Sequence, residues 1–281
     1  MYKWRKLKDR IFFAVILILS IIAITPVIHL IVVTLANGLS VIIRAGPSFF
    51  TSIPPAPTSK DVGGIAPSLV GSLMLTALAL PITIVIALFS SIMVNEFPRN
   101  PLSIAVDVVE KSLASIPTIA VSMVVYLLVV VPMGTFSTLA GVVALTIVSL
   151  PYAYTYFSTY LRSIPETYRE AAYSIAMSRW KTVTRVFLPI IRRGVLVTVL
   201  MTMARILGET AALLFTVGRY RIGVSTSILG PTDALPLLIF DYILTPYRNF
   251  QEIAWGAAAL LLIAYLIIFI ATKLAVRGVK L

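Results

Sequence analysis

The stretch 112–161 reads SLASIPTIAVSMVVYLLVVVPMGTFSTLAGVVALTIVSLPYAYTYFSTYL and contains no charged side chain. An α-helix needs about 20 apolar residues to cross the hydrocarbon core of a bilayer, so this stretch is long enough for two such helices. Pro132-Met133-Gly134 interrupts it near its middle, and both Pro and Gly favour a turn over a continuing helix. The stretch therefore predicts two membrane helices joined by a tight turn.

The rest of the chain is equally apolar. Hydrophobic residues make up 59% of its 281 residues and charged residues only 12%, whereas about a quarter of the residues in a soluble domain are charged. Three other uncharged intervals are long enough for one helix each: 11–43, 62–95 and 253–272. A further segment of spanning length, 194–218, carries Arg205 and Glu209. The sequence thus predicts an all-α integral membrane protein with six transmembrane helices.

Charge placement predicts the orientation of these helices. The first span follows a basic segment, 1–10, but its apolar run is much longer than the roughly 7 to 15 residues of a cleaved signal, so we expect a retained helix. Six helices put both ends of the chain on one side, together with the loops 95–111 and 161–193. That side holds 17 of the 23 Lys and Arg residues. The positive-inside rule therefore predicts a multi-pass plasma-membrane protein with both termini in the cytoplasm.

The net charge of +12 needs no nucleic-acid partner. The positive charges are spread over short loops between apolar helices, and membrane topology already accounts for them. The chain has no cysteine, which excludes a disulfide framework and a thiol site. We expect no cofactor or metal on this chain and a lipid bilayer around it.

The cytoplasmic segment 163–189, SIPETYREAAYSIAMSRWKTVTRVFLP, is too polar to span but is patterned. Ser163 and Glu166 have the spacing of a capping box, and Pro165 is tolerated in a first helical turn. One helical face is then formed by Ile164, Tyr168, Ala171, Ala172 and Ile175. The pattern predicts a short amphipathic helix that ends near Arg179. Such a helix either rests on lipid headgroups or docks on another protein, and the alanines at its centre suit close approach to a protein.

The same segment resembles the EAA loop of ABC importer permeases, whose pattern is EAA, three residues, Gly, nine residues, Ile, one residue, Leu-Pro. The matching residues here are Glu170, Ala171, Ala172, Ala176 in place of Gly, Val186 in place of Ile, Leu188 and Pro189. The resemblance implies a coupling helix that docks on a dimer of cytoplasmic ATPase subunits. None of the 14 glycines is followed by lysine, so the chain lacks a Walker A motif. ATP and Mg are therefore expected on the partner ATPase, and this chain is expected not to be an enzyme.

Arg205 and Glu209 are the unusual residues of the segment 194–218. Arg205 lies about halfway along it, and an arginine at the centre of a membrane helix costs roughly 2.5 to 3.5 kcal/mol. Four residues separate the two charges, so in a helix each would partly neutralise the other. A structural ion pair is one interpretation. Ionisable residues in membrane helices more often line a substrate path, and a guanidinium suits an oxyanion, so we favour a path that also includes the Thr210 hydroxyl.

Four stretches resemble the phosphate-importer permeases of the PstA type: ARILGETAALLFTVG (204–218), GGIAPSLVGSLMLT (63–76), LASIPTIAVSMVVY (113–126) and ALPLLIFDYILTPY with EIAWGAAALLL (234–262). The resemblance implies the type I ABC importer permease fold and phosphate as substrate. It also implies a second permease subunit of the PstC type and an extracytoplasmic phosphate-binding protein as partners. Permeases for sulfate, molybdate or tungstate, and a secondary transporter that works without ATP, are the alternatives.

This organisation divides the chain into three parts. Residues 1–62 hold the cytoplasmic tail, the first helix and an outer loop, residues 63–276 form the transporter domain with its coupling loop 161–193, and residues 277–281 form a second tail. Within the domain, the apolar segment 222–240 is interrupted by two prolines and Asp233. It is too broken to span, and it forms either a re-entrant or lateral helix or an ordinary outer loop.

Overall fold

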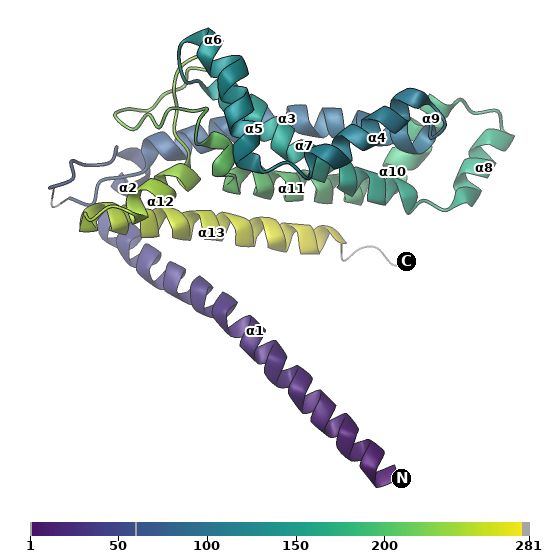
Figure 1. The fold of residues 1–281 in the computed structure, drawn as a ribbon, viewed down its shortest axis with the longest axis horizontal. Helices are drawn as coiled ribbons and strands as arrows, with labels where there is room; N and C mark the ends of the chain where they lie inside the picture. Colours follow the sequence, from purple (N-terminus) through teal and green to yellow (C-terminus); the bar gives the residue numbers. More distant parts are fainter. Residues whose placement is uncertain (1, 60, 277–281) are drawn as a thin grey trace.

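A computed structural model describes residues 2–59 and 61–276, and the predicted tail 277–281 lies outside this described part (Figure 1). The elements there are helical, as the sequence predicts. The longer helices are α1 (Tyr2–Ala45), α3 (Ala66–Glu96), α4 (Pro101–Leu113), α5 (Thr118–Val125), α7 (Thr138–Arg162), α8 (Glu166–Ser174), α11 (Arg192–Gly208), α12 (Leu235–Ile243) and α13 (Arg248–Val276). The short pieces are α2 (Ser48–Thr51), η1 (Tyr126–Val130), α6 (Val131–Met133), α9 (Arg179–Thr182), η2 (Val183–Phe187), α10 (Leu188–Ile190) and η3 (Ala211–Leu213).

Four of the described helices, α1, α3, α7 and α13, are long and apolar enough to cross a membrane. The number rises to the predicted six if each of two bent pairs crosses as one span. In the first pair α4 meets the segment 118–133 at 107°, and in the second the segment 179–190 meets α11 at 75°. The prediction of a loop over 95–111 was wrong in part, because α4 begins at Pro101 and Asn100 caps it by accepting a hydrogen bond from the Leu102 N–H. The predicted turn is confirmed at Gly134, which ends α6 with a φ of 68°.

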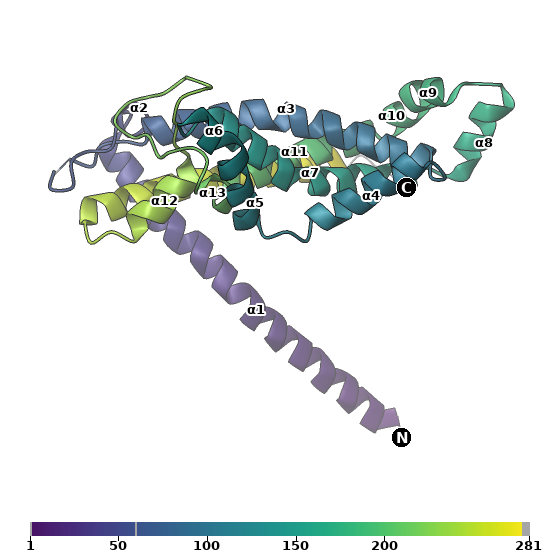
Figure 2. The same cartoon turned by 45° about the horizontal axis from the view of Figure 1, so that its top comes forward.

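The helices α3, α7 and α11 form the centre of the bundle, and α13 lies along α11 (Figures 1 and 2). The buried faces of α3, α7 and α11 meet η3, α12 and the segment 214–234 in one apolar cluster, which consists of Leu75, Ala79, Val142, Leu145, Ile206, Leu213, Val217, Ala234 and Leu237. The helices carry few charges but many small residues, and Gly141 shows why: a Cβ there would lie 2.5 Å from a methyl of Val217. Close packing of this kind replaces the hydrophobic driving force that is absent between helices in lipid.

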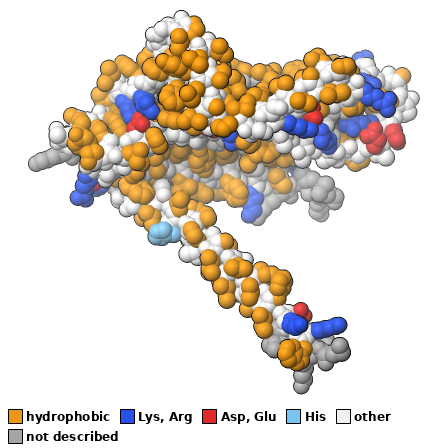
Figure 3. Space-filling view, in the orientation of Figure 1, with side chains coloured by type: hydrophobic (Ala, Val, Ile, Leu, Met, Phe, Trp, Pro, Cys, Tyr) orange, Lys and Arg blue, Asp and Glu red, His pale blue; other side chains and the backbone are white. Residues whose placement is uncertain are grey.

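Most of α1 lies away from the bundle. Its N-terminal part projects outward with its apolar side chains exposed all round (Figures 1 and 3). Only its C-terminal part packs on α13, where a Cβ on Gly38 would lie 2.3 Å from the Cβ of Ala259. This exposed apolar surface has to be covered by lipid or by another membrane protein, since it is far larger than a soluble protein exposes.

The two ends of the bundle differ in character. The start of α1, the end of α13 and α8 lie toward one end of the molecule, and α2, α12 and the segment 214–234 lie at the other (Figures 1 and 2). The termini and the loop 161–193 thus share one side, as six alternating helices require. Many Lys and Arg side chains are visible at the α8 end in Figure 3.

At the opposite end lies a partly buried ionic cluster, which we call the outer cluster (Arg221, Asp233, Asp241). Arg221 binds Asp233 through two hydrogen bonds of 2.7 and 3.1 Å and Asp241 through one of 2.8 Å. Burial alone would lower the pKa of the Arg221 guanidinium, but its bonds to Asp233 and Asp241 outweigh burial and raise that pKa. Ser68 of α3 donates a further hydrogen bond to Asp233. The cluster therefore ties the irregular segment 214–234 to α12 and α3.

Both interpretations of 222–240 are thus partly correct. The segment begins as an irregular loop and ends in the nine-residue helix α12, whose first turn is buried against its neighbours. At 1.5 Å per residue such a helix is roughly 14 Å long, which is too short to cross a bilayer.

The burial of Asp233 yields a stability prediction. Its side chain is fully buried, and removing one charge from a buried pair costs about 3 to 5 kcal/mol. Asp233→Asn should therefore lower the midpoint of thermal unfolding in detergent strongly. The control is Glu252→Gln, because Glu252 pairs with the exposed Arg44 and Arg248 and should contribute about 0 to 1 kcal/mol. Equal shifts in the two variants would contradict the assignment of the outer cluster as the main tie.

Candidate functional site

The segment that carries Arg205 differs from its prediction in one respect. Residues 194–218 do not form one helix, because α11 ends at Gly208 and Glu209 continues in an extended conformation with a ψ of 119°. Arg205 therefore lies in the last turn of α11 and not halfway along a span, and Glu209 and Thr210 lie beyond the helix. The apolar composition gave no sign of this break. Gly208 itself packs closely on α13, since a Cβ there would lie 1.9 Å from the Tyr265 hydroxyl.

The two charges still meet. A nitrogen of the Arg205 guanidinium lies 3.8 Å from a carboxylate oxygen of Glu209, and both side chains are half-buried. The guanidinium also lies over the ring of Tyr152 in α7, 3.5 Å from its centre. A cation on an aromatic face is attracted by the ring quadrupole by about 0.5 to 2 kcal/mol. Arg205 is thus held by a ring and a loose ion pair, and Tyr152 is a site residue that sequence reasoning missed.

Several polar atoms around Arg205 have no hydrogen-bond partner within the described part of the chain. The Nε of Arg205 is buried and unpaired, and so is the hydroxyl of Thr202, one helical turn earlier in α11. On α7 the hydroxyl of Ser149, one turn before Tyr152, is also buried and unpaired. Buried polar groups without a partner are rare, and each one requires a specific explanation. The junction of α7 and α11 at Arg205 is therefore the candidate site.

The arrangement favours a mobile anion over a tightly held one. The fork of a guanidinium can make two parallel hydrogen bonds to an oxyanion. Here one face of that guanidinium is covered by Tyr152, while the Glu209 carboxylate stands close enough to compete for the same charge. Glu209 also accepts a hydrogen bond from the Ala212 N–H at 3.4 Å, which anchors it to the turn after Thr210. These groups can bind a small oxyanion and release it again.

The segment 163–189, which we call the coupling segment after its resemblance to the EAA loop, contains the predicted helix, but the helix has different ends. α8 begins at Glu166 and ends at Ser174, so it stops before Arg179. The capping box was wrong: Pro165 precedes the helix without a capping bond, and the Ser163 hydroxyl donates to the Tyr160 carbonyl.

The predicted apolar face of α8 is divided in two. Ile164 and Ala172 are buried, whereas Tyr168, Ala171 and Ile175 are exposed. Together with the exposed Glu170, these three residues form what we call the docking face. Farther along the chain, Leu188 and Pro189 lie in α10. Leu188 packs against a buried cluster that includes Ile164 and Phe187, and Pro189 is exposed. Large apolar side chains exposed around an alanine are more typical of a surface that contacts another protein than of a surface that faces water.

Ala176 occupies the position where the EAA pattern has glycine. Its φ is 54°, in the left-handed region. The Ala176 N–H donates to the Tyr173 carbonyl at 2.9 Å, and the Met177 N–H donates to the Ala172 carbonyl at 3.1 Å. These two bonds form a Schellman motif, in which the residue after the helix is usually glycine. The glycine of the pattern thus corresponds to the helix C-cap, and this chain keeps the same turn with alanine.

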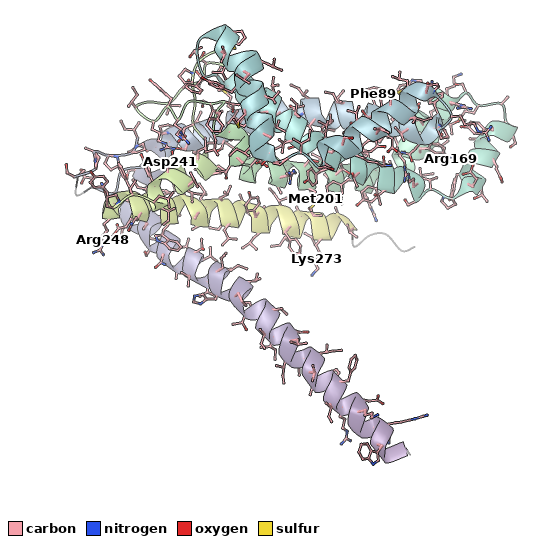
Figure 4. The ribbon with its side chains drawn as sticks, in the orientation of Figure 1. Phe89, Arg169, Met201, Asp241, Arg248 and Lys273 are labelled. Atoms are coloured by element: carbon pink, nitrogen blue, oxygen red, sulfur yellow. The ribbon has the colours of Figure 1, made fainter. Side chains whose placement is uncertain are left out.

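Sequence reasoning also missed the residues that hold α8 to the bundle. Arg169 donates to the carboxylate of Glu96, the last residue of α3, at 2.8 Å. Glu96 was visible as the acid that ends the uncharged interval 62–95, and Arg169 adjoins the EAA residues. Their pairing across 73 positions of sequence was not readable, because no local pattern links them. Figure 4 shows Arg169 at the α8 end of the molecule.

Comparison with known proteins identifies the family and the fold of the chain. The model of the family described as binding-protein-dependent transport system inner membrane components matches residues 79–281, and the chain belongs to that family. Two solved structures share the fold. One is the MetNI methionine ABC transporter in inward-facing conformations, with a TM-score of 0.62, 20% identity and coverage of 76% of this chain and 95% of that one. The other is an amino acid ABC transporter, with a TM-score of 0.60, 18% identity and coverage of 86% and 98%. The fold is that of type I ABC importer permeases.

Curated relatives are more specific. The chain is 35% identical over 273 residues to a protein from Methanocaldococcus jannaschii named as a probable phosphate transport system permease protein PstA, with 97% of this chain and 95% of the relative covered. It is 30% identical to the phosphate transport system permease protein PstA of Yersinia pestis, with 96% and 90% covered. Within its family, the chain is therefore a PstA-type permease.

The left-handed alanine gives a second prediction. A residue with a Cβ costs roughly 1 to 2 kcal/mol in this region, while glycine gives back about 0.4 to 1 kcal/mol through the unfolded state. Ala176→Gly should therefore stabilise the turn by up to about 1 kcal/mol, with slower amide hydrogen exchange at Ala176 and Met177. Ala171→Gly is the matched control, since Ala171 lies inside α8 and glycine should destabilise the helix there by about 1 kcal/mol. Faster exchange in Ala176→Gly would contradict the assignment of a strained cap.

Proposed function

We propose that the chain forms half of the translocation path of an ATP-driven phosphate importer. The observation that carries the proposal is Arg205, a half-buried guanidinium held over Tyr152. Among the described residues, its Nε and the hydroxyls one turn away have no hydrogen-bond partner. Phosphate is a tetrahedral oxyanion that accepts two parallel bonds from such a fork. The PstA relatives, named for phosphate transport, support this substrate.

The energy for transport comes from a separate chain in this proposal. A dimer of ATPase subunits binds ATP and Mg in the cytoplasm and contacts the docking face of α8 around Glu170. ATP binding then rocks two permease subunits against each other, so that the path opens alternately to either side. The match of Ala171, Ala172, Ala176, Leu188 and Pro189 to the EAA pattern supports this role.

The remaining partners follow from the same assignment. A second permease of the PstC type completes the path, and a phosphate-binding protein delivers the anion from outside the plasma membrane. The excess of Lys and Arg on the side of the termini supports their cytoplasmic placement. The second permease and the lipid bilayer together cover the exposed part of α1.

The first functional prediction concerns Arg205. Arg205→Gln removes the charge and the guanidinium fork and leaves a shorter polar side chain. Loss of a hydrogen bond to a charged group costs about 1.5 to 3 kcal/mol, so uptake of labelled phosphate at low concentration should fall by about tenfold or more. The control is Arg44→Gln, because Arg44 is exposed, lies in the last turn of α1 and pairs with Glu252 of α13. Normal phosphate uptake by an assembled Arg205→Gln complex would contradict this role and show that the Arg205–Glu209 pair is purely structural.

The substrate itself is tested by competition. If the path is selective for phosphate, an excess of sulfate, molybdate or tungstate should leave uptake of labelled phosphate by the purified complex unchanged. Strong inhibition by one of them, with uptake of that anion in its place, would favour the alternative permease.

The docking face gives the second functional prediction. Glu170 is an exposed member of this face, and Glu170→Lys reverses its charge without disturbing a buried contact. The ATPase should then co-purify with the permease in much smaller amount. Lys181→Glu is the control, because Lys181 is also exposed but lies in α9, outside the docking face. Full phosphate uptake by the Glu170→Lys protein without a bound ATPase would support the alternative that the chain is a secondary transporter that works without ATP.

A further inference from the structure

The coupling segment contacts the C-terminal end of α3 through a set of residues that we call the inner joint (Glu96, Arg169, Arg179). The Arg169–Glu96 ion pair measures 2.8 Å, and the Glu96 side chain is only 2% exposed. Arg179 donates to the backbone carbonyl of the same Glu96 at 2.7 Å. Two arginines from either side of the Ala176 turn therefore converge on one residue at the end of α3.

Aromatic contacts reinforce the joint. The guanidinium of Arg169 lies 5.0 Å from the centre of the Phe187 ring, and that of Arg179 lies 4.9 Å from the centre of the Phe97 ring. Trp180 of α9 stacks on Phe89 of α3, with ring centres 6.1 Å apart and an angle of 7° between the rings. The coupling segment is thus attached to α3 at its last residue and again two turns earlier.

The outer end of α3 is attached just as specifically. The Ser68 hydroxyl donates to Asp233, and the Ser72 hydroxyl accepts a hydrogen bond of 2.8 Å from the Leu235 N–H at the start of α12. Between these ends runs one continuous helix of 31 residues, roughly 46 Å long at 1.5 Å per residue. Figure 4 shows Arg169 near one end of the molecule and Asp241 of the outer cluster near the other.

We propose that Glu96 and Arg169 are positioning residues that make α3 follow α8. They would transmit movement of the docking face to the outer cluster and to the mouth of the path. The inference rests on the proposed function, since it assumes that an ATPase moves α8. The physical reason is that a buried carboxylate cannot leave its arginine without a large penalty, so α3 and α8 move as one body. Closely packed helices have low compressibility, so a shift of one helix is passed on to its neighbours.

The test measures coupling in the complete complex reconstituted in proteoliposomes. Glu96→Gln has the same shape as the native side chain but removes the charge. We expect the ATPase to co-purify and to hydrolyse ATP, while phosphate transported per ATP falls about fivefold or more, the lower end of typical coupling between sites. The control is Glu166→Gln: Glu166 pairs with the same Arg169 at 3.3 Å but its side chain is 70% exposed, so coupling should be unchanged.

A second pair of variants separates transmission from folding. Arg169→Lys keeps a positive charge opposite Glu96 and should retain most of the coupling, whereas Arg169→Gln should lose it. Three results would overturn the inference: unchanged coupling in Glu96→Gln, equal losses of transport and ATP hydrolysis, or loss of the ATPase from both Glu96→Gln and Arg169→Gln. In the last case the pair would only shape the docking face.

The wild-type complex shows whether the proposed function fails instead. If it hydrolyses ATP but moves sulfate, molybdate or tungstate and not phosphate, the proposed substrate is wrong, and the coupling ratio is measured with the anion that it does move. If no ATPase binds the wild-type chain, the proposed function is wrong before the joint is tested.

Discussion

The cost of placing charge among apolar helices is the constraint on which the rest of this structure depends. Unpaired charges in such surroundings cost several kcal/mol, so each must find a partner or lie where a helix ends. The buried or half-buried ionic groups discussed above follow that rule: Glu96 closes α3, Arg205 lies in the last turn of α11, and Asp233 precedes α12. Each is also a place where distant segments meet. Between these points the helices are apolar and held by small residues, so the polar contacts determine which helices move together.

The sequence predicted the elements better than their ends. Uncharged intervals located the apolar helices because hydropathy over 20 residues is a strong signal. The end of α11 at Gly208 was missed because the mainly apolar composition continues to Gly218, and hydropathy does not locate the end of a helix inside such a run. α4 was taken for a loop because Asp107, Glu110 and Lys111 make it less apolar than its neighbours. The capping box at Ser163 failed because that hydroxyl found a carbonyl in the preceding turn.

The candidate site divides in the same way. Arg205, Glu209 and the EAA residues could be named from the sequence because charge inside an apolar run and a spaced motif are local signals. Tyr152 and Arg169 could not, because a cation–π contact and an ion pair across 73 positions require the folded chain. The position of Ala176 is an intermediate case: the motif marked it as a glycine site, and the structure supplies the reason, a Schellman cap.

The early end of α11 has an electrostatic consequence for whatever passes Arg205. The C-terminus of a helix carries a partial negative charge equivalent to roughly half an electron, concentrated in its last turn. That turn contains Arg205 and is followed directly by Glu209. In the proposed function, an anion at the guanidinium would meet one attraction and two repulsions, so its net binding would be weak. Such a site would limit residence time, tight capture would have to take place elsewhere in the assembly, and this chain would provide a fast exit.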